Sequence, residues 1–301
     1  MSMVCPSAKI LRTRIVLPAM LLFWLLCTLP AKAQGDYSYS LNTDGTLNIE
    51  AYSGSGGDIT LPATHTHLAV TSIGEDVFYQ LTNLTSVIIP GSFTNIGVGA
   101  FYLCTGLTNV IMSNGMEVIS AGAFEYCSNL TSVAIPDNVI TIGQEAFLQS
   151  GLTSVIIGTN LGSIADYAFY DCASLKGIHF QGNPPSLGMP VETNVFFGDN
   201  NATVYYLADA MGWGPVYGGR PAFVWNPQVQ TGGPSFGVLA NRFGFTITGS
   251  TNLVVVVAAS SGLANPVWTP VSTNTLTGGW SYFNDPQWTN YPARFYRLNF
   301  P

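Results

Sequence analysis

The sequence predicts a β-rich solenoid of stacked repeats, with parallel strands and short helical or 3-10 turns, followed by a small antiparallel β-sandwich-like module. Three observations support this prediction. Apolar columns recur about every 23 residues, each repeat contains a short run of β-branched residues, and the composition changes after Trp225. A fixed period indicates a repeat architecture because each copy encodes the same supersecondary unit.

The repeat is defined by three apolar columns that keep the same register in five copies. The phenylalanines recur at spacings of 23, 23, 23 and 22, and the isoleucines lie five residues earlier. A single unit cannot bury its apolar face, whereas a stack of units can, so we expect these columns to form the core of five repeats over residues 73–180. The columns are Phe78, Phe101, Phe124, Phe147 and Phe169; Ile73, Ile96, Ile119, Ile142 and Ile164; and Leu84, Leu107, Leu130, Leu152 and Leu175.

Within a repeat, the segment from Leu84 to Pro90 predicts a strand, because β-branched residues favour strands and proline ends them. The segment from Ala100 to Cys104 predicts a short helical or 3-10 turn. A small residue follows each isoleucine of the column, and serine or alanine replaces glycine in two copies. We therefore expect this position to require small size and not a positive φ.

Three cysteines share one repeated position, namely Cys104, Cys127 and Cys172. Cys104 and Cys127 belong to adjacent repeats and could form a disulfide if the protein is exported. Leu81 and Ser150 occupy the same position in two other repeats, which favours a column of small, partly buried thiols.

The unit I-G-x-x-A-F-x-x-C-x-x-L-T-S-V-x-I-P resembles the BspA-like class of bacterial leucine-rich repeats over residues 47–226. The resemblance implies a leucine-rich-repeat solenoid in an exported protein of adhesion type. Residues 34–72 resemble an N-terminal cap with a degenerate first repeat, and residues 181–226 a degenerate C-terminal cap. Such caps are needed because a bare end would expose the core and an unpaired strand edge.

Residues 1–33 predict a secretory signal peptide. Basic residues precede an apolar run over residues 15–29, and Ala31 and Ala33 form a small-x-small cleavage site before Gln34. We therefore expect cleavage near Ala33/Gln34, a secreted or cell-surface location, and no transmembrane segment in the mature chain.

Removal of the leader would change the charge balance. Four of the nine basic residues and no acidic residue leave with it, so the formal net charge changes from −7 to −11. Because phosphate binding requires clustered cations, this balance argues against nucleic acid or an anionic membrane as a partner.

The predicted strands also define a candidate partner-binding surface. If Leu84, Val87 and Ile89 point inward, the alternate residues point outward. One outward column is mostly apolar and contains Ile88, Ile111, Ala134, Ile156 and His179; its polar companion contains Ser86, Asn109, Ser132, Ser154 and Gly177. Such a stripe on a nearly uncharged sheet suits a protein or extracellular-matrix ligand. The preference of β-branched residues for strands explains the same column without any binding.

Residues 227–236 are rich in Pro, Gly, Gln and Thr and predict a linker, and residues 237–301 predict the C-terminal β-module. This segment resembles a short β-module found at the ends of many exported bacterial proteins. Its aromatic residues could stack on sugars if they were exposed together, although core packing also explains them. They are Trp268, Trp280, Tyr282, Trp288 and Tyr291.

No catalytic, cofactor-binding or metal-binding residue is predicted. Residues 233–237 match the G-x-S-x-G pattern, but the histidine of that catalytic arrangement should follow the serine, and every histidine precedes it. His65 and His67 could supply half of a metal site, yet no third ligand lies at a usable spacing.

The sequence thus favours a non-catalytic binding or adhesion protein that uses the repeat surface. The alternative is a structural component of the cell envelope, in which the repeats act as a spacer and the C-terminal module attaches to the surface or to glycan. An exposed isoleucine stripe favours the first interpretation, and a cluster of exposed tryptophans on the module favours the second.

Overall fold

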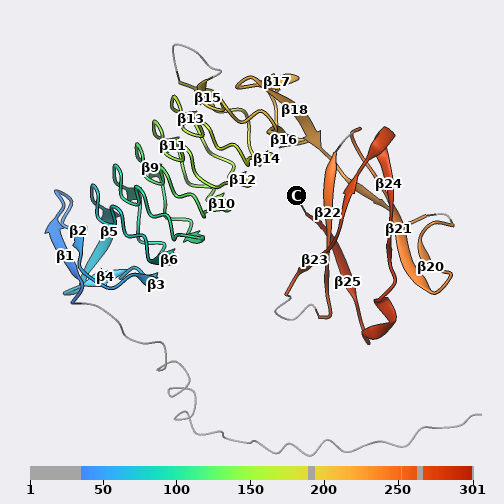
Figure 1. The fold of residues 1–301 in the computed structure, drawn as a ribbon, viewed down its shortest axis with the longest axis horizontal. Coiled ribbons are helices and arrows are strands. Elements are labelled where there is room, and N and C mark those ends of the chain that lie inside the picture. Colours follow the sequence, from blue (N-terminus) through green and yellow to red (C-terminus); the bar gives the residue numbers. More distant parts are fainter. Residues whose placement is uncertain (1–34, 189–193, 233, 252, 263–266, 300–301) are drawn as a thin grey trace, which may run out of the picture. The chain divides into compact units, whose positions relative to one another are not determined.

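The computed structural model describes residues 35–188, 194–232, 234–251, 253–262 and 267–299. The predicted signal peptide and its cleavage site lie outside these residues. Parallel strands stack one repeat upon the next, and antiparallel strands follow them in the chain (Figure 1). The predicted fold class is confirmed.

Two parallel sheets run along the solenoid. The first sheet carries the longer strand of each repeat and is hydrogen-bonded in two parts, with orders β3-β6-β8 and β10-β12-β14-β16-β18-β17. Its strands are β3 (Gly57–Thr60), β6 (Leu84–Ile89), β8 (Asn109–Met112), β10 (Ser132–Ile135), β12 (Ser154–Ile157), β14 (Gly177–Phe180), β16 (Thr203–Leu207), β17 (Val216–Tyr217) and β18 (Arg220–Trp225).

The second sheet has the order β1-β2-β5-β7-β9-β11-β13-β15, and β4 also pairs with β5. Its N-terminal end is covered by β1, which pairs antiparallel with β2 and so closes the edge that the first repeat would leave open. The strands are β1 (Tyr37–Leu41), β2 (Leu47–Tyr52), β4 (Thr64–His65), β5 (Leu68–Ile73), β7 (Asn95–Ile96), β9 (Val118–Ile119), β11 (Thr141–Ile142), β13 (Ser163–Ile164) and β15 (Ser186–Leu187).

The predicted phenylalanine column forms a continuous ladder in the core. Neighbouring rings from Phe78 to Phe169 are nearly parallel, with centroids 4.8, 5.1, 5.3 and 5.2 Å apart. These separations approach the 4.7–4.9 Å between hydrogen-bonded strands, so ring stacking and strand pairing have nearly the same repeat length. The ladder gains a sixth member, Phe196, at 5.5 Å from Phe169.

The segment around each phenylalanine is a series of hydrogen-bonded turns and not the helical or 3-10 turn expected. In each of the five repeats, the residues two before and two after the phenylalanine have a positive φ, for example Asp76 and Gln80 around Phe78. A left-handed residue on either side stops a helix from propagating. In the first four repeats, the backbone amides of the phenylalanine and of these two left-handed residues donate to carbonyls of the next repeat. For example, Phe78 N donates to Ala100 O at 2.8 Å.

In three of the five repeats a glycine follows the isoleucine and packs closely against the preceding repeat. Gly74, Gly97 and Gly143 all lack a positive φ. A Cβ on Gly97 would lie 2.5 Å from the carbonyl carbon of Gly74. The expected size constraint is confirmed.

The three cysteines are free and buried. Each thiol donates to the carbonyl of the preceding repeat's phenylalanine, for example Cys104 to Phe78 O at 3.0 Å and Cys127 to Phe101 O at 3.2 Å. Burial raises the pKa of Cys104 and Cys172 to about 12. The column therefore consists of protonated thiols that act as hydrogen-bond donors inside the core.

The next member of this column is an acid. Asp199 follows Phe196 by three residues, as Cys172 follows Phe169, and its side chain is fully buried. No side chain among the described residues donates a hydrogen bond to its carboxyl oxygens. Arg220 Nη1 donates to the backbone oxygen of Asp199, at 3.0 Å. Burial raises the pKa of Asp199 to about 7, although the backbone amide of Cys172 and the charge of Arg220 act in the opposite direction.

The C-terminal module consists of two antiparallel sheets. The orders are β19-β21-β20, with β24 also paired to β21, and β23-β22-β25. Phe245, Ile247, Val255, Val257 and Phe283 form part of its buried core. The elements are β19 (Gln228–Gln230), β20 (Gly237–Leu239), β21 (Arg242–Thr248), β22 (Val254–Ser260), β23 (Thr269–Thr275), η2 (Thr277–Gly279), β24 (Trp280–Asp285), η3 (Trp288–Asn290) and β25 (Phe295–Asn299).

The predicted linker needs a correction. Residues 228–230, placed in the linker over 227–236, form β19 and pair with Thr246 to Thr248 of β21. Polar composition suggested a linker, but a polar strand is stable where its backbone hydrogen-bonds to a sheet.

The part of the chain that the structure describes contains no helix with the length and apolar character of a membrane span.

The first prediction concerns the ring ladder. Phe124→Ala should lower the free energy of unfolding by about 3–5 kcal/mol, because it removes a fully buried ring and leaves a cavity. Tyr79→Ala removes a ring that is 48% exposed and should cost less than about 1 kcal/mol. Urea unfolding monitored by circular dichroism measures both. Equal losses would contradict the role given to the ladder.

The second prediction concerns pH. The folded-state pKa of Asp199 lies above its ordinary value of 3.8, so neutral Asp199 contributes stability that is complete below pH 4 and lost as the pH rises to about 7. Asp199→Asn should remove this loss, which is on the order of 2–4 kcal/mol. Unfolding free energies at pH 4, 6 and 8 measure it. The control is Asp209→Asn, at an exposed residue. If Asp199→Asn keeps the pH dependence of the wild type, buried Asp199 is not its cause.

Candidate interaction surface

The predicted outward column is assembled by the in-register pairing of the first sheet. Ile88 pairs with Ile111, Ala134 with Ile156, and Ile156 with His179. Their alternate neighbours Leu84, Val87 and Ile89 are fully buried, as the strand pattern predicted. We call Ile88, Ile111, Ala134 and Ile156 the outer column.

The outer column is apolar and open to solvent. Ile88 is 38% exposed and Ile111 48%, Ala134 is exposed, and Ile156 is half-buried. Both isoleucines therefore present branched apolar side chains beside each other on adjacent strands. The hydrogen-bonded ladder is interrupted between β8 and β10, so the column crosses from one part of the first sheet to the other.

The polar companion column lies next to it. Ser86 pairs with Asn109, and Asn109 Nδ2 donates to Ser86 Oγ at 2.9 Å. Ser132 pairs with Ser154, and Ser154 with Gly177. Short hydroxyl and amide groups beside the isoleucines provide donors and acceptors without net charge. Such a surface can bind a partner by apolar contact and neutral hydrogen bonds.

His179 does not belong to the accessible surface, which corrects the prediction. Its exposed fraction is 0%. Because residue 177 is glycine, the imidazole lies over that position, with Nε2 only 2.5 Å from where a Cβ would be. The ring also stacks on Tyr205, with centroids 5.1 Å apart. Burial lowers the pKa of His179 to about 3, so the side chain is neutral at neutral pH.

The column also extends beyond the residues predicted from sequence. Thr60 of β3 pairs with Ile88 at one end, and Phe223 of β18 pairs with Tyr205 at the other. Phe223 is 41% exposed. The strands over 203–207 and 220–225 lack the 23-residue period, and only their β-branched and aromatic content could have indicated them.

The module's tryptophans do not form one exposed cluster. Trp280 is 58% exposed, and it shares an outward face of β24 with Tyr282, which is 36% exposed. The Trp268 ring lies under the Arg297 guanidinium, 4.7 Å from it, and Trp288 Nε1 donates to Asn241 O at 3.2 Å. Tyr291 lies under Arg294 at 4.0 Å.

The residues that suggested catalysis or metal binding lie in ordinary environments. Ser235 lies in a turn followed by a strand, where the nucleophile pattern needs a helix, and its hydroxyl accepts a hydrogen bond from Thr246. Gly233 lies outside the described residues. The His65 ring stacks on Tyr39 at 4.2 Å. The described residues contain no group of three or more His, Cys, Asp or Glu that could hold a metal ion.

Comparisons with known proteins agree with this architecture. The BspA type leucine rich repeat region matches residues 55–188 in six copies. None of the curated proteins matches the sequence.

The chain is also similar to solved structures of bacterial leucine-rich repeat proteins. A leucine rich repeat protein of Treponema pallidum is 27% identical, with 57% of this chain and 79% of that chain covered and a TM-score of 0.52. A leucine rich cell surface protein of Faecalibacterium prausnitzii is 27% identical, with 61% and 56% covered and a TM-score of 0.43. A leucine-rich repeat protein of Bacteroides capillosus is 30% identical, with 42% and 96% covered and a TM-score of 0.39.

The matched residues 55–188 coincide with the stacked strands and most of the phenylalanine ladder. The repeat, its buried columns and its similarity to a solved bacterial solenoid point the same way. Residues 55–188 of this chain form a leucine-rich repeat region of the BspA type.

Proposed function

We propose that the protein is an exported, non-catalytic binding protein of adhesion type, whose outer column contacts a protein or extracellular-matrix ligand. The supporting observation is the exposure of Ile88 and Ile111 in register, beside a neutral polar column. Apolar side chains exposed next to one another on a rigid sheet lower the entropic cost of binding, because the surface is ordered before the partner arrives.

The test is a pull-down from host or environmental extracts with the mature protein. Changing Ile88, Ile111 and Ile156 to Asp should abolish capture of the partner, because three charges would have to be desolvated on binding. A matched control changes Val98 and Ile140 to Asp and should still capture the partner. These two residues are 49% and 53% exposed and lie outside the outer column. A triple variant that folds and captures every partner would rule out the outer column.

Export has its own test. The precursor, expressed in a bacterial host, should be found outside the cytoplasm with Gln34 as its first residue, because the predicted cleavage follows Ala33. Edman sequencing or mass spectrometry of the purified protein measures the new N-terminus. Recovery of a chain that still begins with Met1 would contradict the signal peptide.

A second candidate function is a structural envelope component that attaches through the C-terminal module to the surface or to glycan. Trp280 and Tyr282 support it, since two exposed rings on one face of β24 could stack on a sugar. The mature protein should then bind a glycan array, and Trp280→Ser should reduce that binding at least tenfold. If the mature protein binds no glycan on the array, or if Trp280→Ser binds as well as the unchanged protein, this function is contradicted.

A further inference from the structure

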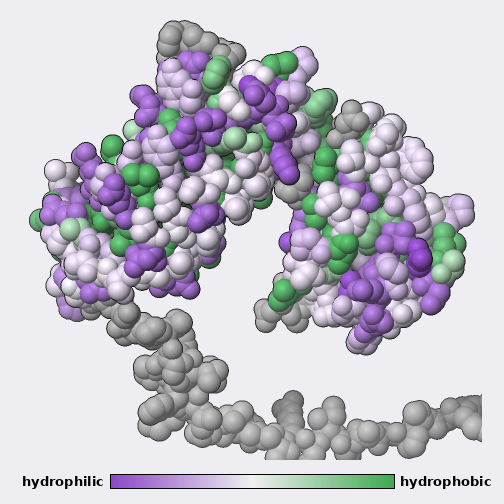
Figure 2. Space-filling model, viewed as in Figure 1, coloured by the Kyte–Doolittle hydropathy of each residue, from purple (hydrophilic) through white to green (hydrophobic). Residues whose placement is uncertain are grey.

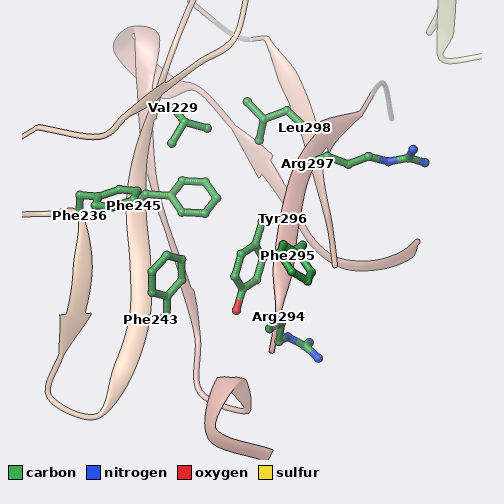
Figure 3. Close-up of a pocket in the computed structure, with 9 residues that line it drawn as sticks. All are labelled: Val229, Phe236, Phe243, Phe245, Arg294, Phe295, Tyr296, Arg297 and Leu298. Carbon is green, nitrogen blue, oxygen red and sulfur yellow. The ribbon is translucent and has the colours of Figure 1, made fainter. Parts of the chain in front are cut away.

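The C-terminal module contains an apolar gap between its two sheets. The gap has a volume of about 260 Å³, and Val229, Phe236, Phe243, Phe245, Tyr296 and Leu298 line it. Figure 3 shows Phe243 and Phe245 on one side and Tyr296 on the other. The rings of Phe243 and Tyr296 are nearly parallel, with centroids 5.2 Å apart. Phe236 and Val229 are 41% and 36% exposed, so the gap opens to solvent.

The gap lies where the sandwich has an open edge. β21 pairs along one edge with β24, and β24 packs beside β23 of the other sheet. Along its other edge β21 pairs with β19 and β20, which have three residues each. β25 ends the second sheet, and the described residues place no strand on its outer side. Its outer edge therefore presents backbone donors and acceptors beside an apolar gap.

The edge strand β20 of the other sheet also carries exposed apolar residues. Val238 and Leu239 of β20 are 51% and 46% exposed. Figure 2 shows apolar residues, in green, at the side of the module that Figure 1 labels β20. Exposed apolar side chains gathered along one edge indicate an interaction site more strongly than single ones scattered over a surface.

The charge of the module differs in sign from that of the solenoid. Residues 227–301 contain three arginines and one aspartate, whereas residues 35–226 contain fifteen acidic and two basic residues. The aspartate, Asp285, pairs with Arg294 at 2.5 Å, and no other ion pair occurs among the described residues. Exposed Arg297 forms no ion pair and lies over the Trp268 ring at 4.7 Å, and Figure 3 shows it extending from β25 away from the gap.

We infer that the module binds an extended acidic peptide, which adds as a strand to the outer edge of β25. Side chains of a strand alternate between the two faces. On the added strand, apolar residues would enter the gap between Phe243 and Leu298, and the intervening acidic residues would lie beside Arg297. Backbone hydrogen bonds would supply affinity, and the gap and the arginine would select the sequence.

Two observations favour this occupant over others. The gap of about 260 Å³ is smaller than the roughly 300–1,000 Å³ of pockets that enclose drug-sized molecules, and suits a few side chains. A second copy pairing antiparallel through the same strand would place Arg297, the central residue of β25, opposite its own counterpart. Like charges directly opposite destabilise a strand pair, which disfavours this self-pairing.

The experiment uses the mature protein and an array of seven-residue peptides. Positions 2, 4 and 6 carry Val, Ile, Leu or Phe, and the other positions carry Glu, Asp, Ser or Thr; a mirror array replaces the acids with Lys. We expect acidic peptides to bind at least tenfold more tightly than their Lys counterparts. Methylating the backbone nitrogens of the best peptide should abolish binding, because the side chains remain but strand pairing is lost.

Variants locate the site. Arg297→Glu and Phe236→Ser should each weaken binding of the best peptide at least tenfold. Arg242→Glu and Val267→Ser remove another exposed arginine and another exposed apolar side chain of the module and should change binding less than twofold. Equal binding of acidic and basic peptides, equal effects of the control variants, or binding of an anionic oligosaccharide but no peptide would overturn the inference. None of these outcomes bears on the outer column of the solenoid.

Discussion

The structure of residues 35–226 depends on one constraint, which is that each repeat must lie about one strand spacing from the next along its whole circuit. Strand pairing sets this distance in the two sheets. In the turns, the stacked phenylalanine rings and the backbone hydrogen bonds between successive repeats keep nearly the same distance. A residue in one repeat therefore contacts the same residue of its neighbours. Packing therefore favours the same residue type at equivalent positions of successive repeats, because a substitution in one repeat changes its contacts with both neighbouring repeats.

This constraint explains where the chain departs from its own pattern. Inside, the thiols of the cysteine column bond to phenylalanine carbonyls, and this column ends in the buried acid Asp199. At the N-terminal end of the second sheet, β1 pairs antiparallel where another repeat would otherwise be needed. Outside, the columns are free of packing demands, and here neutral polar residues and isoleucines alternate. At one end of the polar companion column, Asp58 pairs with Ser86.

The repeats could be predicted from the sequence because the 23-residue period records the stacking directly. Strand limits, the inward-facing residues and the size constraint at Gly97 all follow from that period. The burial of His179 could not be predicted, since it depends on the absence of a side chain at residue 177 on the same strand. The sequence predicted a helical or 3-10 turn around each phenylalanine, and the two left-handed residues of the observed turn could not be predicted because they accompany hydrogen bonds to the next repeat. The gap beside β25 was also missed, because it arises from pairing between segments far apart in the chain.

The central claim is that contacts between repeats, rather than within them, hold the solenoid together. Native-state hydrogen exchange resolved to single amides tests this most directly. The amides of Phe101, Phe124 and Phe147 donate to the next repeat, and they should exchange only through the opening that unfolds the whole stack, with equal free energies. Exchange at these amides as fast as in the exposed turn at Thr66 and His67, or with a separate free energy for each repeat, would contradict the account.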